Sequence, residues 1–204
     1  MKLNLKKISW LLIFIFMAGF SSAAAASDIF LYDDFNGSAT NSMPASFTFK
    51  GNGNARVVED GPGNKAFFFP SADSSLLSAD LTGTGTQYIV SLRLKFMGKR
   101  SGMKLTMKNA SASFSPVSAS AAGVITTHDG KRIGTTSMGY YTTITIGYNG
   151  ATKKYFVAVD GKTQVSDWRA GTDVSSPTAI LLNFTAPDTE PSLDNQVYLS
   201  LIHI

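Results

Sequence analysis

The chain has 204 residues, of which 44% are hydrophobic, 16% are charged and 18 are glycine. This composition is typical of a turn-rich β protein and excludes a disordered tail, which would carry more charge and fewer aromatic residues. The net charge of +4 overstates that of the folded part, because Lys2, Lys6 and Lys7 lie in an acid-free leader and the remaining 15 basic residues face 14 acidic ones. Such a nearly neutral domain has no electrostatic footprint for nucleic acid or for an anionic membrane.

The N-terminus has the three parts of a secretory signal peptide. The positive segment MKLNLKK is followed by an apolar run at 8–20 and by the small residues SSAAAAS. We therefore predict a helical signal peptide at 1–26, a secreted or cell-surface location, and no membrane association after cleavage. The alternative is an uncleaved anchor, but the run is shorter than the ~20 residues that a span needs. The absence of cysteine excludes a lipid-anchoring thiol, a thiolate metal site and a cysteine nucleophile.

Apolar and polar residues alternate along most of the mature domain, residues 27–198. This period of two predicts strands with one face in a core and the other in water. The predicted strands are residues 29–34, 46–50, 55–59, 66–69, 75–80, 87–96, 103–108, 124–128, 131–134, 143–148, 153–159, 162–165, 178–184 and 196–199. So many short strands predict an all-β fold, a two-sheet antiparallel jelly-roll sandwich.

Turn signals separate several of these strands. The dipeptides Asp129-Gly130, Asn149-Gly150 and Asp160-Gly161 each tolerate the positive φ of tight primed turns, so each predicts a hairpin. The small-residue segment 110–123 is consistent with either a flexible loop or a pair of strands with small side chains. The aromatic run Phe67 to Phe69 is expected to be core, because continuous apolar strands are usually buried on both faces.

The last six residues, LSLIHI at 199–204, resemble one reading frame of a transposase adapter used in preparing sequencing libraries. A hydrophobic strand with no closing turn is also an unusual end for a domain. We therefore predict a non-native tail at 199–204 and a gene that continues beyond Tyr198, with an ordinary terminal strand as the alternative. His203 lies in this stretch and is given no functional weight.

Three stretches carry a family resemblance: IFLYDDFNG near the mature start, YYTTITIGYNGATKKYFVAVDGKTQV in the middle and LDNQVYL near the end. Together they resemble the concanavalin A-like lectin/glucanase superfamily, in its laminin-G-like bacterial branch. The resemblance covers residues 28–198, and its specific part is the hairpin from Tyr155 to Val165. It implies a lectin-like domain of the kind that accompanies polysaccharide lyases, glycoside hydrolases and surface proteins as a sugar-binding or spacer module, although fold likeness alone does not establish function.

The sequence lacks the catalytic pattern of the glucanase members. The resemblance implies two glutamates and an aspartate alternating along one strand, so that a nucleophile and an acid flank the sugar bond. The chain has only Glu59 and Glu190, far apart and in turn-like contexts. A Ser-His-Asp site is disfavoured because His128 and Asp129 are adjacent at a turn, where we expect a histidine in solvent. We therefore predict that the domain is not an enzyme.

A structural calcium ion is the one cofactor that the resemblance implies. Asp33 and Asp34 end the opening strand, and Asp194 and Asn195 precede the closing strand. Opening and closing strands are neighbours in this superfamily, so these oxygens are predicted to converge on one ion, as calcium prefers. The alternative is that all four residues only end strands and start turns.

A carbohydrate site is predicted around Trp168, the only tryptophan after the leader. Trp168 lies in SDWRAGTD, a polar segment predicted to be a loop, where its ring could stack on a sugar between Asp167 and Arg169. The alternative is a tryptophan folded over the rim of the core. Tyr141 is a further predicted sugar contact, because one of two adjacent strand tyrosines faces outward.

From these features we predict a secreted, non-catalytic, carbohydrate-binding module, a monomeric N-terminal part of a larger extracellular protein. Its predicted partner is a polysaccharide or a cell-surface glycan. Two alternatives stay open at this point. One is a structural or adhesive spacer that binds no sugar. The other is an accessory domain of a polysaccharide lyase or glycoside hydrolase whose catalytic domain lies beyond Tyr198.

Overall fold

The computed structural model describes residues 31–51, 55–69, 76–81, 86–97, 102–170, 172–185 and 196–204. For residues 165–170, Thr185 and His203 it describes the backbone but not the side chain. Strands, turns and irregular segments make up these residues, which contain no helix. The leader predicted at 1–26 lies outside them. Within the described part, no helix is long and apolar enough to cross a bilayer.

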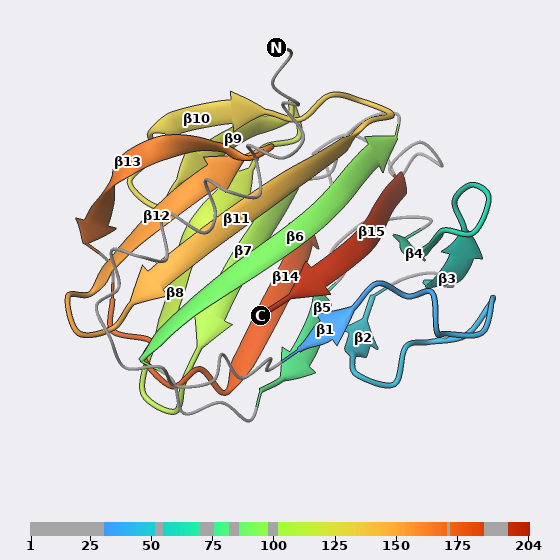
Figure 1. Cartoon of the computed structure of the whole chain (residues 1–204), viewed down its shortest axis with the longest axis horizontal. Coiled ribbons are helices and arrows are strands. Elements are labelled where there is room, and N and C mark those ends of the chain that lie inside the picture. The colour runs from blue at the N-terminus through green and yellow to red at the C-terminus, as the bar shows by residue number, and fades with distance from the viewer. Residues whose placement is uncertain are drawn as a thin grey trace, which may run out of the picture.

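Fifteen strands run through the described residues (Figure 1). They are β1 (Tyr32–Asp33), β2 (Thr48–Lys50), β3 (Arg56–Glu59), β4 (Lys65–Phe69), β5 (Leu76–Asp80), β6 (Gln87–Met97), β7 (Gly102–Lys108), β8 (Ser113–Ala119), β9 (Val124–Thr127), β10 (Arg132–Thr135), β11 (Tyr141–Asn149), β12 (Lys154–Val159), β13 (Lys162–Ala170), β14 (Ala179–Thr185) and β15 (Gln196–His203).

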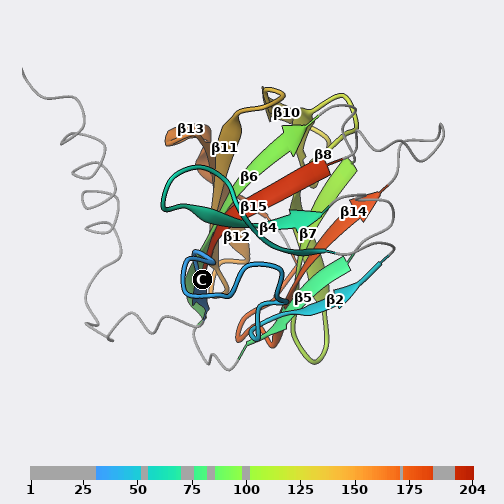
Figure 2. The ribbon, with the colours of Figure 1, turned by 90° about the vertical axis from the view of Figure 1, so that its right-hand side faces the viewer.

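The strands form two antiparallel sheets, which Figure 2 shows as two facing layers. Sheet A has the order β13-β12-β11-β6-β15-β4-β3, and β1 also pairs with β15. Sheet B has the order β10-β9-β8-β7-β14-β5-β2. Neighbouring strands are often distant in sequence, as where β6 lies between β11 and β15. The predicted two-sheet sandwich is therefore confirmed, and the chain has the jelly-roll fold.

Alternation along the strands produces the core between the sheets. In β6, residues Tyr88, Val90, Leu92, Leu94 and Phe96 are all buried, and the residues between them face outward with partial or full exposure. Each buried large apolar side chain contributes roughly 1.5–3 kcal/mol to folding. The period-two prediction for this segment is confirmed.

Aromatic side chains fill one end of the core. Phe67 and Phe69 of β4 are fully buried, with ring centroids 4.8 Å apart, and Phe69 contacts Phe184 of β14 at the same distance. Phe68 points to the other face of sheet A, where it is 9% exposed. The prediction that this run belongs to the core rather than to a ligand patch agrees with this burial on both faces.

All three turn dipeptides lie between strands that pair as hairpins, but their turns differ. At Asp129-Gly130, between β9 and β10, the positive φ falls on Gly130 alone. Asp160 and Gly161 both have positive φ, 49° and 73°, so they form the predicted tight turn between β12 and β13. The hairpin predicted at Asn149-Gly150 is present, since β11 pairs with β12, but its turn is longer, because Asn149 stays in β11 opposite Lys154 and the positive φ falls on Lys153. The Asn149 side chain instead accepts a hydrogen bond from Thr152 N at 3.3 Å, which supports a longer turn.

Two stretches left open by the sequence have a defined place. The segment 110–123 contributes β8, which pairs with β7 and β9. Its register with β7 shifts around Pro116, and an irregularity of this kind accommodates a residue that cannot donate a ladder hydrogen bond. Residues 199–203 belong to β15, which pairs with β6 across this stretch. That residues 199–204 are a non-native tail stays a prediction.

Candidate functional site

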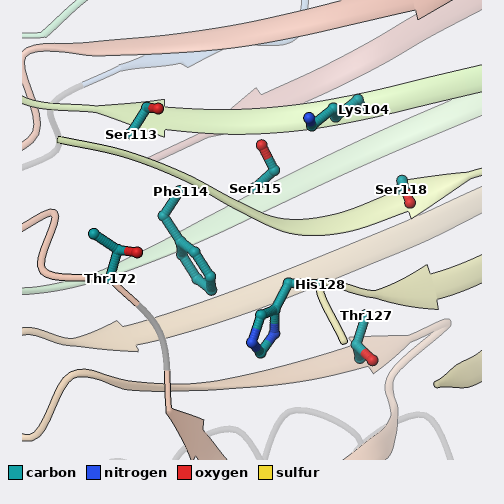
Figure 3. Close-up of a pocket in the computed structure, with 8 residues that line it drawn as sticks. All are labelled: Lys104, Ser113, Phe114, Ser115, Ser118, Thr127, His128 and Thr172. Atoms are coloured by element: carbon teal, nitrogen blue, oxygen red, sulfur yellow. The ribbon is translucent and has the colours of Figure 1, made fainter. Parts of the chain in front are cut away.

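A pocket of about 650 Å³ opens where the start of β8 meets the end of β9 and the β13–β14 connection. Figure 3 shows its walls, with the Phe114 and His128 rings side by side and Thr172 at one end. The lining residues are mostly hydroxyl-bearing or basic: Lys104, Ser113, Phe114, Ser115, Ser118, Thr127, His128 and Thr172. Among these described lining residues there is no aspartate or glutamate.

Small side chains on the outer face of sheet B leave the space for this pocket. Ser115 Oγ shares a hydrogen bond of 2.8 Å with Thr106 Oγ1 of β7, and Ser118 Oγ shares one of 3.1 Å with Thr126 Oγ1 of β9. These cross-strand pairs hold the hydroxyl groups in fixed positions. A hydroxyl both donates and accepts hydrogen bonds, so this face can bind polar ligands rich in hydroxyl groups.

The His128 ring is held at the pocket wall by the core. Its Nδ1 and Tyr155 Oη share a hydrogen bond of 2.7 Å, although 27 residues separate the two in sequence. The imidazole also meets the rings of Phe114 and Tyr155 edge-on, with centroids 5.3 and 5.4 Å away. His128 is exposed at a hairpin, as predicted, but the sequence did not predict this fixed orientation. Its Nε2 is the ring nitrogen left for a ligand.

Buried tyrosines fix the opposite wall. Tyr148 Oη donates to the carbonyl of Thr172 at 2.8 Å and accepts from Val174 N at 3.0 Å. Tyr88 Oη donates to the Val174 carbonyl at 3.2 Å. Burial raises the pKa of both tyrosines, so the hydroxyl groups stay protonated and able to donate. The β13–β14 connection is thereby tied to the core beside the pocket.

Tyr141, predicted as a sugar contact, lies on the outer face of sheet A instead. Five directly opposite residues on five adjacent strands form what we call the cross-strand row: Tyr141, Lys95, Tyr198, Phe68 and Arg56. Lys95 Nζ lies 4.8 Å from the Tyr141 ring centroid and 4.4 Å from that of Tyr198. The Phe68 and Tyr198 rings are 4.7 Å apart, and the Arg56 guanidinium lies 5.7 Å from Phe68.

Asp60 closes one end of this row. Its carboxylate accepts hydrogen bonds from Lys95 Nζ and from Tyr141 Oη. Burial acts to raise the pKa of Asp60, but these bonds outweigh it and hold the pKa below the ordinary value. Burial and the same bond raise the pKa of Tyr141. The Arg93 guanidinium also lies 4.4 Å from the Tyr141 ring centroid, so Tyr141 contacts Asp60, Lys95 and Arg93. Its role in sugar binding stays a prediction.

Trp168, Asp167 and Arg169 lie on a strand and not in the predicted loop. The strand β13 continues to Ala170, because Arg169 and Ala170 pair with Tyr155 and Lys154 of β12. The side chains of these three predicted residues lie outside the described part. Tyr155 is in turn opposite Tyr148, which is seven residues along β11 from Tyr141. At about 3.3 Å per residue, the backbones of Tyr141 and Arg169 are therefore separated by roughly 23 Å along the strands.

The predicted calcium ligands are only partly described. Asp33 Oδ1 accepts a hydrogen bond from Phe35 N at 2.7 Å, and Asn36 donates to both oxygens of Asp34. Burial raises the pKa of Asp33, and the charge of Asp34 raises it further, whereas the hydrogen bond from Phe35 N acts to lower it. Asp194 and Asn195 lie outside the described residues.

The register of the closing strand bears on the same ion site. The opening strand β1 pairs with the closing strand β15, as predicted. However, Asp33 lies opposite Ile202, which is six residues along β15 from Gln196 at the start of that strand. Among the described residues, no group of three or more acidic or histidine side chains could hold a metal ion. The calcium ion stays a prediction.

No protein-family model and no curated protein matches the sequence. Solved structures match the fold. A sialidase superposes with a TM-score of 0.64 at 14% identity, over 88% of this chain and 18% of the sialidase chain. SCLam, a non-specific endo-β-1,3(4)-glucanase of family GH16, superposes with a TM-score of 0.57 at 14% identity, over 89% of this chain and 92% of that one.

Domain 4 of AbnA, a GH43 extracellular arabinanase from Geobacillus stearothermophilus, superposes with a TM-score of 0.55 at 14% identity, over 86% of this chain and 92% of that one. Its structure contains arabinotriose. At this identity the matches show the fold alone, which is the concanavalin A-like jelly roll predicted from the three sequence stretches. The structural neighbours are thus domains of carbohydrate-active proteins.

Proposed function

We propose that this domain is an exported, non-catalytic carbohydrate-binding module, and that it binds its glycan in the pocket of sheet B. The pocket carries this proposal, because it combines fixed hydroxyl groups with the edge of the Phe114–His128 pair. Sugars present many hydroxyl groups and some C–H surface, which suit such a lining. The fold is also that of domains such as the arabinotriose-bound one.

The non-catalytic part of the proposal is supported by the acidic residues. Glycoside hydrolysis normally needs two carboxyl groups flanking one bond. Of the two glutamates, Glu59 lies on β3 in the other sheet, and the described lining residues of the pocket include no carboxylate. Prolonged incubation with polysaccharides should release no reducing ends, whereas a measurable rate would contradict this part.

The binding part can be tested by filling the pocket. The variant Ser118→Trp places a large ring on the lining, and we expect it to weaken retention on an insoluble glycan by at least about tenfold. Retention on a panel of insoluble polysaccharides would be measured first for the unaltered domain, and then for the variant on the polysaccharide that binds best. Tryptophan is well tolerated on strands, so the fold should persist.

A matched control exists on the opposite face. Ser91 of β6 shares a hydrogen bond of 3.2 Å with Thr145 of β11, as Ser118 does with Thr126. Both are cross-strand Ser–Thr pairs on an outer face, so Ser91→Trp makes the same change away from the pocket. Retention should survive Ser91→Trp. Equal loss in both variants, or unchanged retention in both, contradicts the assignment of the pocket.

A second candidate is an accessory domain within a larger glycan-degrading protein. It is favoured by the sialidase match, in which this chain corresponds to only 18% of that chain, and by the arabinanase match, which is to a single domain. Recovering the complete gene tests it directly. A catalytic domain beyond this chain would support an accessory role, and its absence would favour a free-standing module.

A further inference from the structure

The ionisable side chains in the described lining of the pocket are basic, and the nearby Asp129 carboxylate bonds to the lining residue Thr127. Lys104 and His128 line the pocket, and no acidic residue does so within the described part. The chain outside the leader is nearly balanced in charge, with 15 basic and 14 acidic residues. A pocket with a basic lining favours anionic ligands over neutral ones.

Within the described residues, Lys104 forms no ion pair. It is an exposed residue of β7, in register with Ser118 of β8 and Asn183 of β14. In the described residues the ion pair is that of Lys95 with Asp60, on the outer face of sheet A. The Lys104 ammonium group is therefore available to a ligand, and it can donate three hydrogen bonds.

His128 is positioned to donate from Nε2. When Tyr155 Oη donates to Nδ1, the neutral ring carries its proton on Nε2, and the protonated ring carries one there as well. In both states the ring presents an N–H to the pocket. The adjacent carboxylate of Asp129 already accepts a hydrogen bond from Thr127 Oγ1. With this tautomer, a ligand atom that meets Nε2 is an acceptor.

A neighbouring hollow provides a contrast. It measures about 580 Å³, shares Thr172 with the pocket, and includes both Lys153 and Asp173 in its lining. Hydrogen bonds from Ser175 lower the pKa of Asp173, and the nearby charge of Lys153 lowers it further. The carboxylate is therefore ionised beside a lysine, which balances the charge there. Of these two hollows, the first is therefore the one whose described lining favours an anion.

We infer that the pocket takes an anionic glycan, with a carboxylate or sulfate group of the sugar bound by Lys104 and His128. Serine and threonine hydroxyl groups of the lining bind the sugar hydroxyls around it. This inference rests on the proposed function and adds the chemical class of the ligand. The two anionic groups share one chemistry, since both offer several acceptor oxygens to charged donors.

Titration calorimetry with three galactose-based oligosaccharides tests the inference and separates the two sources. An oligogalacturonate carries carboxylates, a carrageenan oligosaccharide carries sulfates, and a galacto-oligosaccharide is neutral. We expect one anionic ligand to bind at least about tenfold more tightly than the neutral one, as for a charge-assisted hydrogen bond over a neutral one. Lys104→Ala should weaken that ligand about fivefold or more, and His128→Gln about threefold.

The control variant is Lys50→Ala, which removes the same charge from exposed Lys50 on β2, at the far edge of sheet B. It should leave anionic binding unchanged. Neutral binding that is as tight as anionic binding, and insensitive to Lys104→Ala, overturns the inference while the proposed function stands. Anionic binding that depends equally on Lys50 and Lys104 overturns it as well. Failure of every glycan to bind would end both proposals.

Discussion

The two outer faces of this sandwich are built from different side chains. On sheet A, large aromatic and basic residues contact one another in the cross-strand row, and the ring of Phe156 lies so close over Gly147 that an added Cβ there would be 2.0 Å from it. On sheet B, two serine–threonine pairs of the kind that sheet A has at Ser91 and Thr145 lie on the outer face, and a pocket opens beside them.

This difference shows how a sandwich with two similar sheets can divide stability and recognition between its faces. Rings and long side chains that contact one another bury area and add to folding free energy. Small hydroxyl residues bury little, but they leave room and polar groups for a ligand. Mutations on sheet A should therefore change mainly unfolding, and those at the pocket mainly binding.

The largest expected effect comes from truncating the row at its buried ring. Phe68→Ala removes the contacts with Tyr198 and Arg56 and should lower the free energy of unfolding by about 3 kcal/mol. Urea denaturation measures it. On sheet B, Thr106→Ala removes only the bond to Ser115 and should cost less than about 1 kcal/mol. Similar costs for the two variants would show that the faces do not differ in this way.

The next largest effect concerns Asp60, where charge supports the same row. Asp60→Asn weakens its bonds with Lys95 and Tyr141 and should cost about 1 kcal/mol at neutral pH, because solvent still reaches the pair. Since the pKa of Asp60 is lowered in the folded state, its contribution is present above the unfolded pKa of about 3.9 and is lost as the pH falls through the folded pKa.

Urea denaturation of both proteins at pH 7 and near pH 2.5 should therefore show a gap that closes in acid. Tyr141→Phe is the partial control, since it removes one of the two donors and keeps the ring. It should cost less than Asp60→Asn at pH 7. A gap that persists unchanged in acid would mean that Asp60 acts through its shape and not through its charge.

Local pattern was enough to predict the fold. Alternation in β6 is a property of consecutive residues, and both faces of the strand follow from it. The turn at Asp160-Gly161 is equally local, since the two residues themselves adopt positive φ. Asn149-Gly150 correctly predicted a hairpin but not its turn, because pairing of Asn149 with Lys154 lengthens the loop, and such pairing depends on the neighbouring strand.

The pocket could not be predicted in this way. It depends on which strands lie side by side, and the bond between His128 and Tyr155 joins the turn after β9 of sheet B to β12 of sheet A. The one sequence signal was Pro116, which marks the irregularity in β8 beside His128, whose N–H donates to the Pro116 carbonyl. Strand register also separates the predicted sugar contacts, because Arg169 lies in line with Tyr148, seven residues along β11 from Tyr141.

The smallest expected effect, with the opposite sign, comes from Asp33, which lies outside the row. Its folded-state pKa is raised by burial, so its ionisation costs stability as the pH rises through that value. Asp33→Asn keeps an acceptor for Phe35 N and should stabilise the domain by about 0.3 kcal/mol at pH 7, with no gain near pH 2.5. Thermal unfolding at both values measures the change. A loss of stability at pH 7, parallel to that of Asp60→Asn, would show that the Asp33 charge supports this fold as the Asp60 charge does.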